Sequence, residues 1–578
     1  MDSVILMLLS FIGYIIAYKT YGQFLSNKVF GLNKHTIVPA KELEDGQDYV
    51  PTKKGIIFGH HYTSIAGTGP IVGPAIGIIW GWVPAFLWVF LGSIVMGGVH
   101  DFGSLILSMR HQGKSIAEIT AKYINRRTRL LVFFVVFLEL LILVAIFGLI
   151  VAIIFSMYPQ SVLPVWCEIP IALLLGYMVY RKGGNVTVFT FLAVTLMYIT
   201  VITGHFLPLK MPAFGALPPS GIWVIILLIY AYIASVLPVN VLLQPRDYIN
   251  AWQLFVAMGL LIMGILTAGF QGKAPIIAPA FNLHPQGAPS MWPFLFITIA
   301  CGAISGFHAL VSSGTTAKQV ASEPDAQFVG YGSMLLESIL SLLVIIACGA
   351  GIGMAYTTKN GPLLTGFPAW QAHYGSWAGA SGLGAKVNAF VIGSANMMST
   401  FGIPQAIGIV IMGVFVASFA GTSLDTATRI QRYIISEIAE DLHVDFFKGR
   451  WMATSIAVIT ALILAFATGP DGKGALTLWP LFGTVNQLMA GLALLVVSLY
   501  LRREGPYCWL ALAPCIFILA MTFWGMFINL TSYLRQGNWL LVVIGGLCLV
   551  LVSWVCCEAL LVFQKSGSPK DQSVGLQS

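Results

Sequence analysis

Long apolar runs follow one another along the whole chain and are separated by short polar connections. A helix needs about 20 apolar residues to cross the roughly 30 Å apolar core of a bilayer, and most of these runs are long enough. The pattern predicts about 15 membrane-spanning (TM) helices, over residues 3–25, 56–80, 82–109, 130–157, 162–180, 185–207, 220–243, 249–270, 291–314, 329–356, 387–428, 452–468, 474–500, 508–530 and 539–563. The run 387–428 is too long for one span, so we expect a short re-entrant or surface helix in its first part, around Asn388 to Thr400. The expected fold class is an all-α polytopic membrane protein.

Lysine and arginine are divided unevenly between the connections. Connections after odd-numbered spans hold 24 of the 30 basic residues, and connections after even-numbered spans hold six. Because basic residues concentrate in cytoplasmic loops, the odd-numbered connections are expected in the cytoplasm, with the N-terminus outside and the C-terminus inside. A missed helix would invert this parity from that point on, so the division also supports the number of spans.

The composition excludes a water-soluble domain of ordinary kind. Hydrophobic residues make up 57% of the chain, charged residues only 9%, and the mean hydropathy is +0.86, whereas soluble domains carry about 25% charged residues. The net charge of +8 comes from residues between apolar runs and not from a basic domain, so no nucleic-acid partner is expected. The eight cysteines lie mostly in apolar runs without zinc or disulfide spacing, which indicates buried thiols. The N-terminal run has no basic stretch before it and is expected to be a retained helix.

Two spans contain residues that interrupt helices. Residues 59–74 read Gly-His-His-Tyr-Thr-Ser-Ile-Ala-Gly-Thr-Gly-Pro-Ile-Val-Gly-Pro, and residues 301–315 are rich in Gly, Ser and Thr around His308. Glycine and proline at these positions predict broken helices. Unwound backbone at membrane depth is tolerated only where it lines a cavity or a water-filled path, and two such segments in matching halves indicate a transporter's binding site. The alternative is that the small residues only permit close helix packing.

The two interrupted spans divide the chain into related halves. The second span starts in the cytoplasm and the ninth starts outside, and four further spans follow each, which predicts a 5+5 inverted repeat. The expected organisation is a peripheral helix (1–28), a first repeat (55–207), an inserted two-helix hairpin (218–271), a second repeat (288–500), two peripheral helices (507–565) and a cytoplasmic tail (566–578).

Several segments resemble the bacterial carbon starvation protein A (CstA) family. They are Phe58 to Gly77, Gly97 to Phe102, Gln244 to Tyr248, Ile304 to Lys318 and Gly421 to Thr426. The resemblance implies inner-membrane uptake of small carbon sources, pyruvate or peptides, coupled to protons, as part of a starvation stress response. It also implies the amino acid–polyamine–cation superfamily, whose leucine-transporter-type (LeuT-type) fold is a 5+5 inverted repeat with its first and sixth helices broken around the substrate.

Residues around both breaks are the candidates for substrate binding. Free N–H groups at the N-termini of half-helices favour an anion such as a carboxylate, and glycine lets the backbone come close to it. The candidates are His60, His61, Ser64, Gly67, Thr68, Gly69, Ser305, His308, Ser312 and Ser313. The histidines also suggest a metal site, but no Cys or carboxylate has recognisable ligand spacing with them. We therefore expect no metal and no cofactor other than the coupling ion, H⁺ or alternatively Na⁺.

Charged residues within spans are costly, so they are candidates for ion coupling. The set is His100, Asp101, Glu139, Thr422, Ser423 and Asp425. By the resemblance, Thr422 and Ser423 occupy the region where sodium-coupled relatives bind a cation.

Each of these candidates has a structural alternative. His100 and Asp101 could form a buried hydrogen-bonded pair, and Asp425 could pair with Arg429 at i+4. Glu139 and Glu337 could be protonated structural acids. Residues 245–248 are expected in a short cytoplasmic turn, closed by an Arg–Asp contact or acting as a gate.

The expected function is secondary active import of pyruvate, a similar monocarboxylate or short peptides in the bacterial cytoplasmic membrane. Its partners are then a small-molecule substrate and the lipid bilayer, and the sequence makes no prediction of oligomeric state. No phosphate-binding loop for an ATPase and no His-Glu-x-x-His or Gly-x-Ser-x-Gly motif is present, so we expect no enzyme. The alternatives are an ion channel or a non-transporting nutrient receptor that uses the same midplane site.

Overall fold

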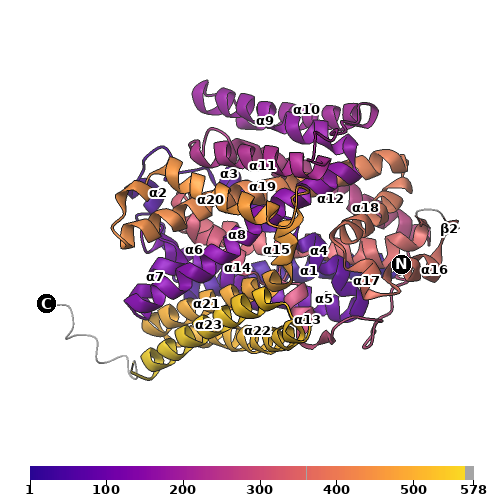
Figure 1. Ribbon diagram of the computed structural model, residues 1–578. Coiled ribbons are helices and arrows are strands. Elements are labelled where there is room, and N and C mark those ends of the chain that lie inside the picture. The colour runs from indigo at the N-terminus through magenta and orange to yellow at the C-terminus, as the bar shows by residue number, and fades with distance from the viewer. Residues whose placement is uncertain (359–360, 566–578) are drawn as a thin grey trace.

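Helices form nearly all the regular structure of the computed structural model, which describes residues 1–358 and 361–565 (Figure 1). The first half holds α1 (Asp2–Ala17), α2 (Pro39–Glu42), α3 (Lys54–Ala66), α4 (Gly69–Gly77), α5 (Trp82–Leu91), α6 (Gly98–Met109), α7 (Ile116–Tyr123), α8 (Arg126–Met157), α9 (Val162–Gly176), α10 (Val186–Phe206), α11 (Pro219–Val236) and α12 (Leu243–Phe270). The second half holds α13 (Met291–Thr298), α14 (Gly306–Gly314), α15 (Ser333–Ile346), α16 (Gly366–Tyr374), α17 (Trp377–Ala380), α18 (Leu383–Ser399), α19 (Gln405–Asp441), α20 (Arg450–Phe466), α21 (Trp479–Glu504), α22 (Trp509–Arg535) and α23 (Trp539–Lys565). Two short antiparallel strands, β1 (Tyr356–Thr357) and β2 (Leu363–Leu364), complete the fold.

Every predicted span coincides with a helix or with a broken pair of helices. Within the described residues, twelve helices are long and apolar enough to cross a membrane, or thirteen if the bent pair α3–α4 counts as one span. The structure thus confirms a mostly helical fold with about twelve candidate membrane spans. The predicted number of fifteen additionally requires that α3–α4, α13–α14 and the 17-residue α20 each cross. The long run at 387–428 is divided between α18 and α19.

The helices differ in how deeply they lie in the bundle. Helices α8, α15, α19 and α21 are largely buried, whereas α1, α10 and α23 present most of their apolar side chains outward. Figure 1 places α9 and α10 along one side of the bundle and α22 and α23 along the opposite side. Lipid is a favourable environment for apolar side chains that face outward on long helices, so the surface of the bundle is suited to a bilayer.

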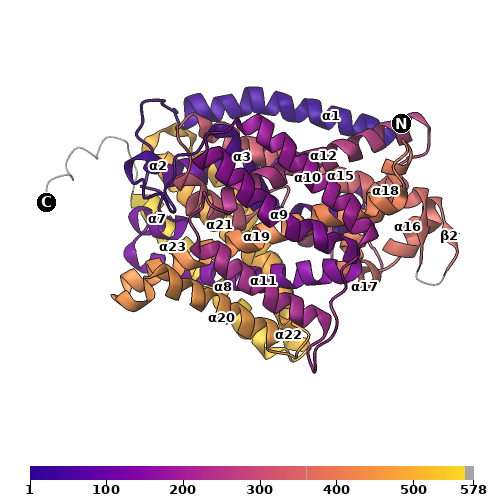
Figure 2. The same ribbon diagram turned by 90° about the horizontal axis from the view of Figure 1, so that it is seen from above.

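The connections gather at two opposite ends of the bundle. Both views show α2 and α7 at one end, and the N-terminus, α16 and β2 at the other (Figures 1 and 2). We call the first the loop end; it also holds the loop of residues 30–53 and the C-terminal part of α19. The tail predicted at 566–578 lies outside the described residues.

One expectation and one alternative about charged residues are wrong. Residues 245–248 do not form a turn between spans, because α11 ends at Val236 and α12 begins at Leu243, which places Pro245–Tyr248 in the first turns of α12. Asp425 does not pair with Arg429 four residues later. Arg429 instead reaches Asp48, and Asp425 pairs with Arg246.

The loop of residues 30–53 is held across the loop end by Asp48. Its Oδ1 accepts hydrogen bonds from Arg429 Nη1 at 2.7 Å, Arg432 Nη2 at 2.8 Å and Tyr433 Oη at 2.7 Å, all on α19. Main-chain N–H groups of Val50 and Thr52 donate to the carbonyls of Lys318 and Gln319, just beyond α14. The loop therefore ties α19 to the end of α14.

Charges around Asp48 predict how this contact responds to pH. Burial alone would raise the pKa of Asp48, but Arg432, Arg429 and Lys318 outweigh burial and hold the pKa well below its ordinary value of 3.8. The folded state has the lower pKa, so the contact stabilises the fold above about pH 4, and this stabilisation is lost as pH falls toward the folded pKa.

We expect Asp48→Asn to lower the stability of the purified protein by about 3 kcal/mol at neutral pH, because Arg429 is left buried with an unpaired charge. The apparent melting temperature in detergent, followed by intrinsic fluorescence, measures the effect. The control Glu44→Gln changes an exposed carboxylate of the same loop and should leave the melting temperature unchanged. Equal melting temperatures for Asp48→Asn and Glu44→Gln would contradict the role given to Asp48.

Candidate functional site

Both helices predicted to be broken are broken. Helix α3 ends at Ala66, Gly67 has φ +45°, and α4 begins at Gly69 after a bend of 43°. Helix α13 ends at Thr298 and α14 begins only at Gly306, with Gly302 at φ +88° between them. Positive φ favours glycine, so Gly67 and Gly302 permit the chain to leave the helical path at these points.

The two breaks lie against each other. A Cβ atom on Gly69 would lie 2.3 Å from Sγ of Cys301, and one on Gly73 would lie 2.8 Å from the carbonyl oxygen of Thr298. A Cβ atom on Gly67 would lie 2.5 Å from Oγ of Ser423 on α19. The small residues therefore serve both purposes considered above, because they break the helices and also let the broken segments approach closely.

Side chains from other helices bind the main-chain groups that the second break leaves free. Asn486 Oδ1 accepts from Phe307 N at 2.9 Å, Gln487 Nε2 donates to Phe296 O at 2.7 Å, and Trp88 Nε1 donates to Ile299 O at 2.8 Å. Sequence reasoning missed Asn486 and Gln487. Two adjacent amides in the middle of the apolar run 474–500 were the available signal, because such groups are costly in a span unless they have partners.

Four buried titratable residues form a continuous series, which we call the histidine chain. His100 Nδ1 lies 2.7 Å from Asp101 Oδ1, Asp101 Oδ2 lies 2.9 Å from His308 Nδ1, and His308 Nε2 lies 3.2 Å from Glu337 Oε2. All four side chains are fully buried. The structure thus brings together two residues expected in ion coupling, His100 and Asp101, and one expected in substrate binding, His308. The predicted contact between His100 and Asp101 is present within this longer series.

A second buried group, which we call the arginine cluster, surrounds Asp425. Arg246 contacts Asp425 through Nη1 and lies 3.3 Å from Glu168 through Nε. The hydroxyl of Tyr230 donates to Asp425 Oδ2 at 2.8 Å. The four residues come from α12, α19, α9 and α11, so the cluster ties four helices together. Sequence reasoning singled out Asp425 but missed Glu168 and Tyr230, and assigned Arg246 to a turn.

The remaining coupling candidates lie near α3 and α8. Ser423 Oγ donates to the carbonyl of Ser64 at 3.4 Å, next to the first break. Thr422 accepts a hydrogen bond from Asn250 of α12 at 2.9 Å. Glu139 is fully buried on α8, and neither of its carboxylate oxygens has a hydrogen-bond partner within the described residues.

The substrate candidates separate into two groups. Ser64, Gly67, Thr68, Gly69, Ser305 and His308 lie at the breaks, whereas His60, His61, Ser312 and Ser313 lie farther along the same helices toward the loop end. His60 Nδ1 lies 2.5 Å from Asp247 Oδ2, and His61 Nδ1 lies 2.8 Å from Thr316 Oγ1. The candidate side chains are buried both at the breaks and toward the loop end. The structure therefore shows a state in which this region is closed to solvent.

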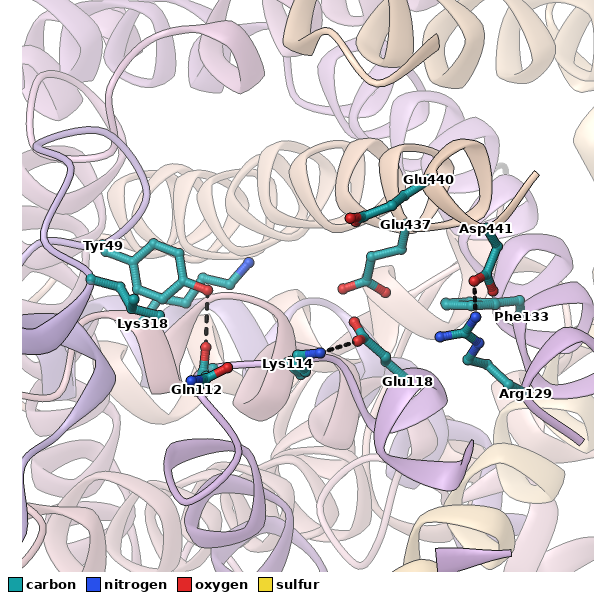
Figure 3. A pocket seen from close by; sticks show the side chains of 12 residues that line it. Tyr49, Gln112, Lys114, Glu118, Arg129, Phe133, Lys318, Glu437, Glu440 and Asp441 are labelled. Atoms are coloured by element: carbon teal, nitrogen blue, oxygen red, sulfur yellow. Dashed lines mark hydrogen bonds and ion pairs between the residues drawn. The ribbon is translucent and has the colours of Figure 1, made fainter. Parts of the chain in front are cut away.

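A polar cavity of about 420 Å³ opens at the loop end (Figure 3). Figure 3 shows Lys318 beside Tyr49 on one side, and Glu437, Glu440 and Asp441 of α19 on the other. Two ion pairs in its wall, Lys114–Glu118 and Arg129–Asp441, bind the connection after α6 and the start of α8 to their neighbours. The cavity lies beyond the end of α14, on the side of the breaks where His60 and His61 lie.

Comparison with protein families decides the relationship that the motifs suggest. The family described as carbon starvation protein CstA matches residues 2–525. The chain belongs to the CstA family. This CstA-family chain is 33% identical to the peptide transporter CstA of Campylobacter jejuni, over 91% of the chain and 80% of that protein. It is 30% identical to the pyruvate/proton symporter BtsT of Escherichia coli, over 90% of the chain and 80% of that protein. The expected class of function, transport across a membrane, is thereby confirmed, and these relatives point to a role other than catalysis.

The fold of this CstA-family chain also resembles that of a solved transporter. A manganese transporter of Eremococcus coleocola superposes with a TM-score of 0.51 at 10% identity, over 90% of this chain and 99% of that one. At this identity the similarity shows a shared fold alone. The overall arrangement of the helices is thus one that a known membrane transporter also has.

Close approach at the first break predicts the effect of adding one methyl group. Gly67→Ala places a Cβ atom against Ser423 Oγ and strains a positive φ, so we expect transport to fall about tenfold or more. Gly55→Ala is the matched control, because a Cβ atom there, on the same helix α3, meets no atom within 4 Å. Uptake into proteoliposomes, with the melting temperature measured in parallel, tests this. Equal uptake by both variants would separate the first break from the transport path.

Proposed function

We propose that this CstA-family protein is a secondary active importer of a small monocarboxylate such as pyruvate, or of short peptides, driven by a proton gradient. The observation that carries the proposal is the direct apposition of two broken helices in the bundle. The names of the relatives support both substrate classes, since one is a peptide transporter and another a pyruvate/proton symporter. Burial of the side chains at both breaks favours alternating access over the continuous pore that a channel needs.

We assign the helices to fifteen spans in a LeuT-type 5+5 inverted repeat. The pair α3–α4 would be followed by α5–α6, α8, α9 and α10, and the pair α13–α14 by α15, α18–α19, α20 and α21. Helices α1, α22 and α23 would be peripheral, and α11–α12 an inserted hairpin. The excess of basic residues in the connections of the loop end supports a cytoplasmic position for it in a bacterial inner membrane, with the N-terminus outside.

The substrate carboxylate would bind between the breaks. Helices α4 and α14 both start there, and their first N–H groups are suited to a carboxylate. Gly67 and Gly69 would let the backbone of the first break contact it, and the main chain of the second break would contact it from the other side. The polar cavity at the loop end would be the cytoplasmic mouth of the path, reached when the loop held by Asp48 moves.

Charge balance in the arginine cluster supports proton coupling. Glu168 and Asp425 share the single guanidinium of Arg246, and Asp247 is paired with His60. Even with His60 protonated, these five buried groups carry one negative charge in excess. A proton on Glu168 or Asp425 removes this excess, and an unpaired buried charge is costly. Na⁺ is the alternative ion, and it would bind near the Ser64 carbonyl with Thr422 and Ser423.

We expect proteoliposomes with the purified protein to accumulate labelled pyruvate, or a labelled dipeptide, only under an imposed proton gradient. Uptake is measured with and without a protonophore, and again with a sodium gradient alone. Uptake that survives collapse of both gradients would exclude secondary active transport and favour a facilitated path.

We expect Asp425→Asn to abolish gradient-driven accumulation to the level of protein-free liposomes and to retain substrate exchange, because the amide cannot carry the proton. Asp445→Asn is the control, since Asp445 is an exposed carboxylate just beyond the same helix α19. Exchange and accumulation are measured on the same proteoliposome preparations. Accumulation that persists in Asp425→Asn with unaltered pH dependence would remove Asp425 from the proton path.

A further inference from the structure

Three side chains with metal-binding atoms converge at the second break. Cys301 lies within the break, His308 on α14 and Glu337 on α15. The Cys301 Sγ, one ring nitrogen of His308 and one carboxylate oxygen of Glu337 all lie within 4.8 Å of one another. His308 and Glu337 are fully buried, and Cys301 is half-buried.

The spacing of the donor atoms fits a single small ion. His308 Nε2 lies 3.2 Å from Glu337 Oε2. Two ligands that each lie about 2.0 Å from a tetrahedral zinc ion are roughly 3.3 Å apart, so this pair already has the separation of two corners of the tetrahedron. Despite its approach to Glu337, His308 Nε2 makes no hydrogen bond of acceptable geometry within the described part of the chain.

The surroundings of His308 fix its orientation as a ligand. Its Nδ1 lies 2.9 Å from Asp101 Oδ2, and the other oxygen of Asp101 lies 2.7 Å from His100 Nδ1. An N–H at Nδ1 would therefore donate a hydrogen bond to Asp101, which leaves the lone pair of Nε2 facing Glu337. Histidine ligands of metals commonly donate their second N–H to a carboxylate in this way.

We propose that Cys301, His308 and Glu337 bind a divalent transition-metal ion of the zinc class. Thiolate, imidazole and carboxylate are all ligands of zinc, and three protein ligands leave a fourth coordination position open. A thiolate and a carboxylate together neutralise the 2+ charge of the ion, which suits a buried site. The ion would join the broken segment to α15 and fix the shape of the second break.

The spacing of these residues in the sequence conceals the site, which is why no metal is expected from the sequence. Cys301 and His308 lie on either side of the point where the helix resumes, so helical periodicity does not relate them. Glu337 comes from the next predicted span. The rival arrangement contains no metal, and a doubly protonated His308 bridges Asp101 and Glu337. The metal-bound and metal-free arrangements differ in metal content and in whether the Cys301 thiol is deprotonated.

Cobalt is the most direct probe, since Co²⁺ occupies zinc sites and a bound thiolate gives it an ultraviolet charge-transfer band with visible bands of tetrahedral coordination. We expect the detergent-purified full chain to bind about one equivalent of Zn²⁺ or Co²⁺. Wild-type protein that has been freed of bound metal with a chelator and then titrated with Co²⁺ should develop the thiolate band. No band in correctly folded wild-type protein would overturn the proposal without recourse to any variant.

Variants assign the ligands. Cys301→Ser and Glu337→Gln should each lower metal content measured by mass spectrometry by more than about tenfold. Cys348→Ser, which alters a buried cysteine outside the three ligands, should retain it. Metal content equal in wild type and Cys301→Ser would also overturn the proposal. These measurements need no substrate and no gradient, so their failure would leave the proposed transport function standing, and the converse also holds.

Discussion

Main-chain hydrogen bonding at the two helix breaks is the constraint on which the rest of the structure depends. In a bilayer no water reaches the N–H and C=O groups that a broken helix exposes, and each one left without a partner costs several kcal/mol. The protein supplies partners from other helices, namely Asn486 and Gln487 of α21 and Trp88 of α5 at the second break, and Ser423 of α19 at the first. Helices α19 and α21, which supply three of these partners, are both largely buried in the bundle.

The buried charges are organised around the same feature. The histidine chain starts on α6, passes through α14 immediately after the second break, and ends on α15. The arginine cluster lies on α19 beyond Ser423 and joins it to α9, α11 and α12. Asp48 holds the loop of residues 30–53 to Arg429 and Arg432, which follow Asp425 along α19. Movement of α19 would therefore act on three places together: the first break, the carboxylates of Glu168 and Asp425, and the loop of residues 30–53. The proposed gradient-driven transport requires a connection of this kind.

Sequence alone predicts the helices and their breaks, but not the side chains that complete the site. Apolar length and glycine or proline interruptions act locally, so spans such as 130–157 and the breaks near Gly67 and Gly302 could be placed in advance. Partners such as Asn486 for Phe307, or Arg246 for Asp425, come from distant segments and depend on packing that periodicity does not encode. Polar residues at the start of α12 resembled a turn because a buried helix end and a loop have similar composition. Arg429 could satisfy the i+4 rule with Asp425, yet its side chain reaches Asp48 instead.

An electron cryo-microscopy structure of the purified protein with bound substrate tests the central claim most directly. The claim is that substrate replaces protein side chains as the partner of the broken helices. Ligand density in contact with Gly67–Gly69 and with residues 299–305, accompanied by separation of the two breaks, is the expected result. Ligand density confined to the cavity beside Tyr49 and Lys318, with both breaks still closed by the side chains described above, would contradict it.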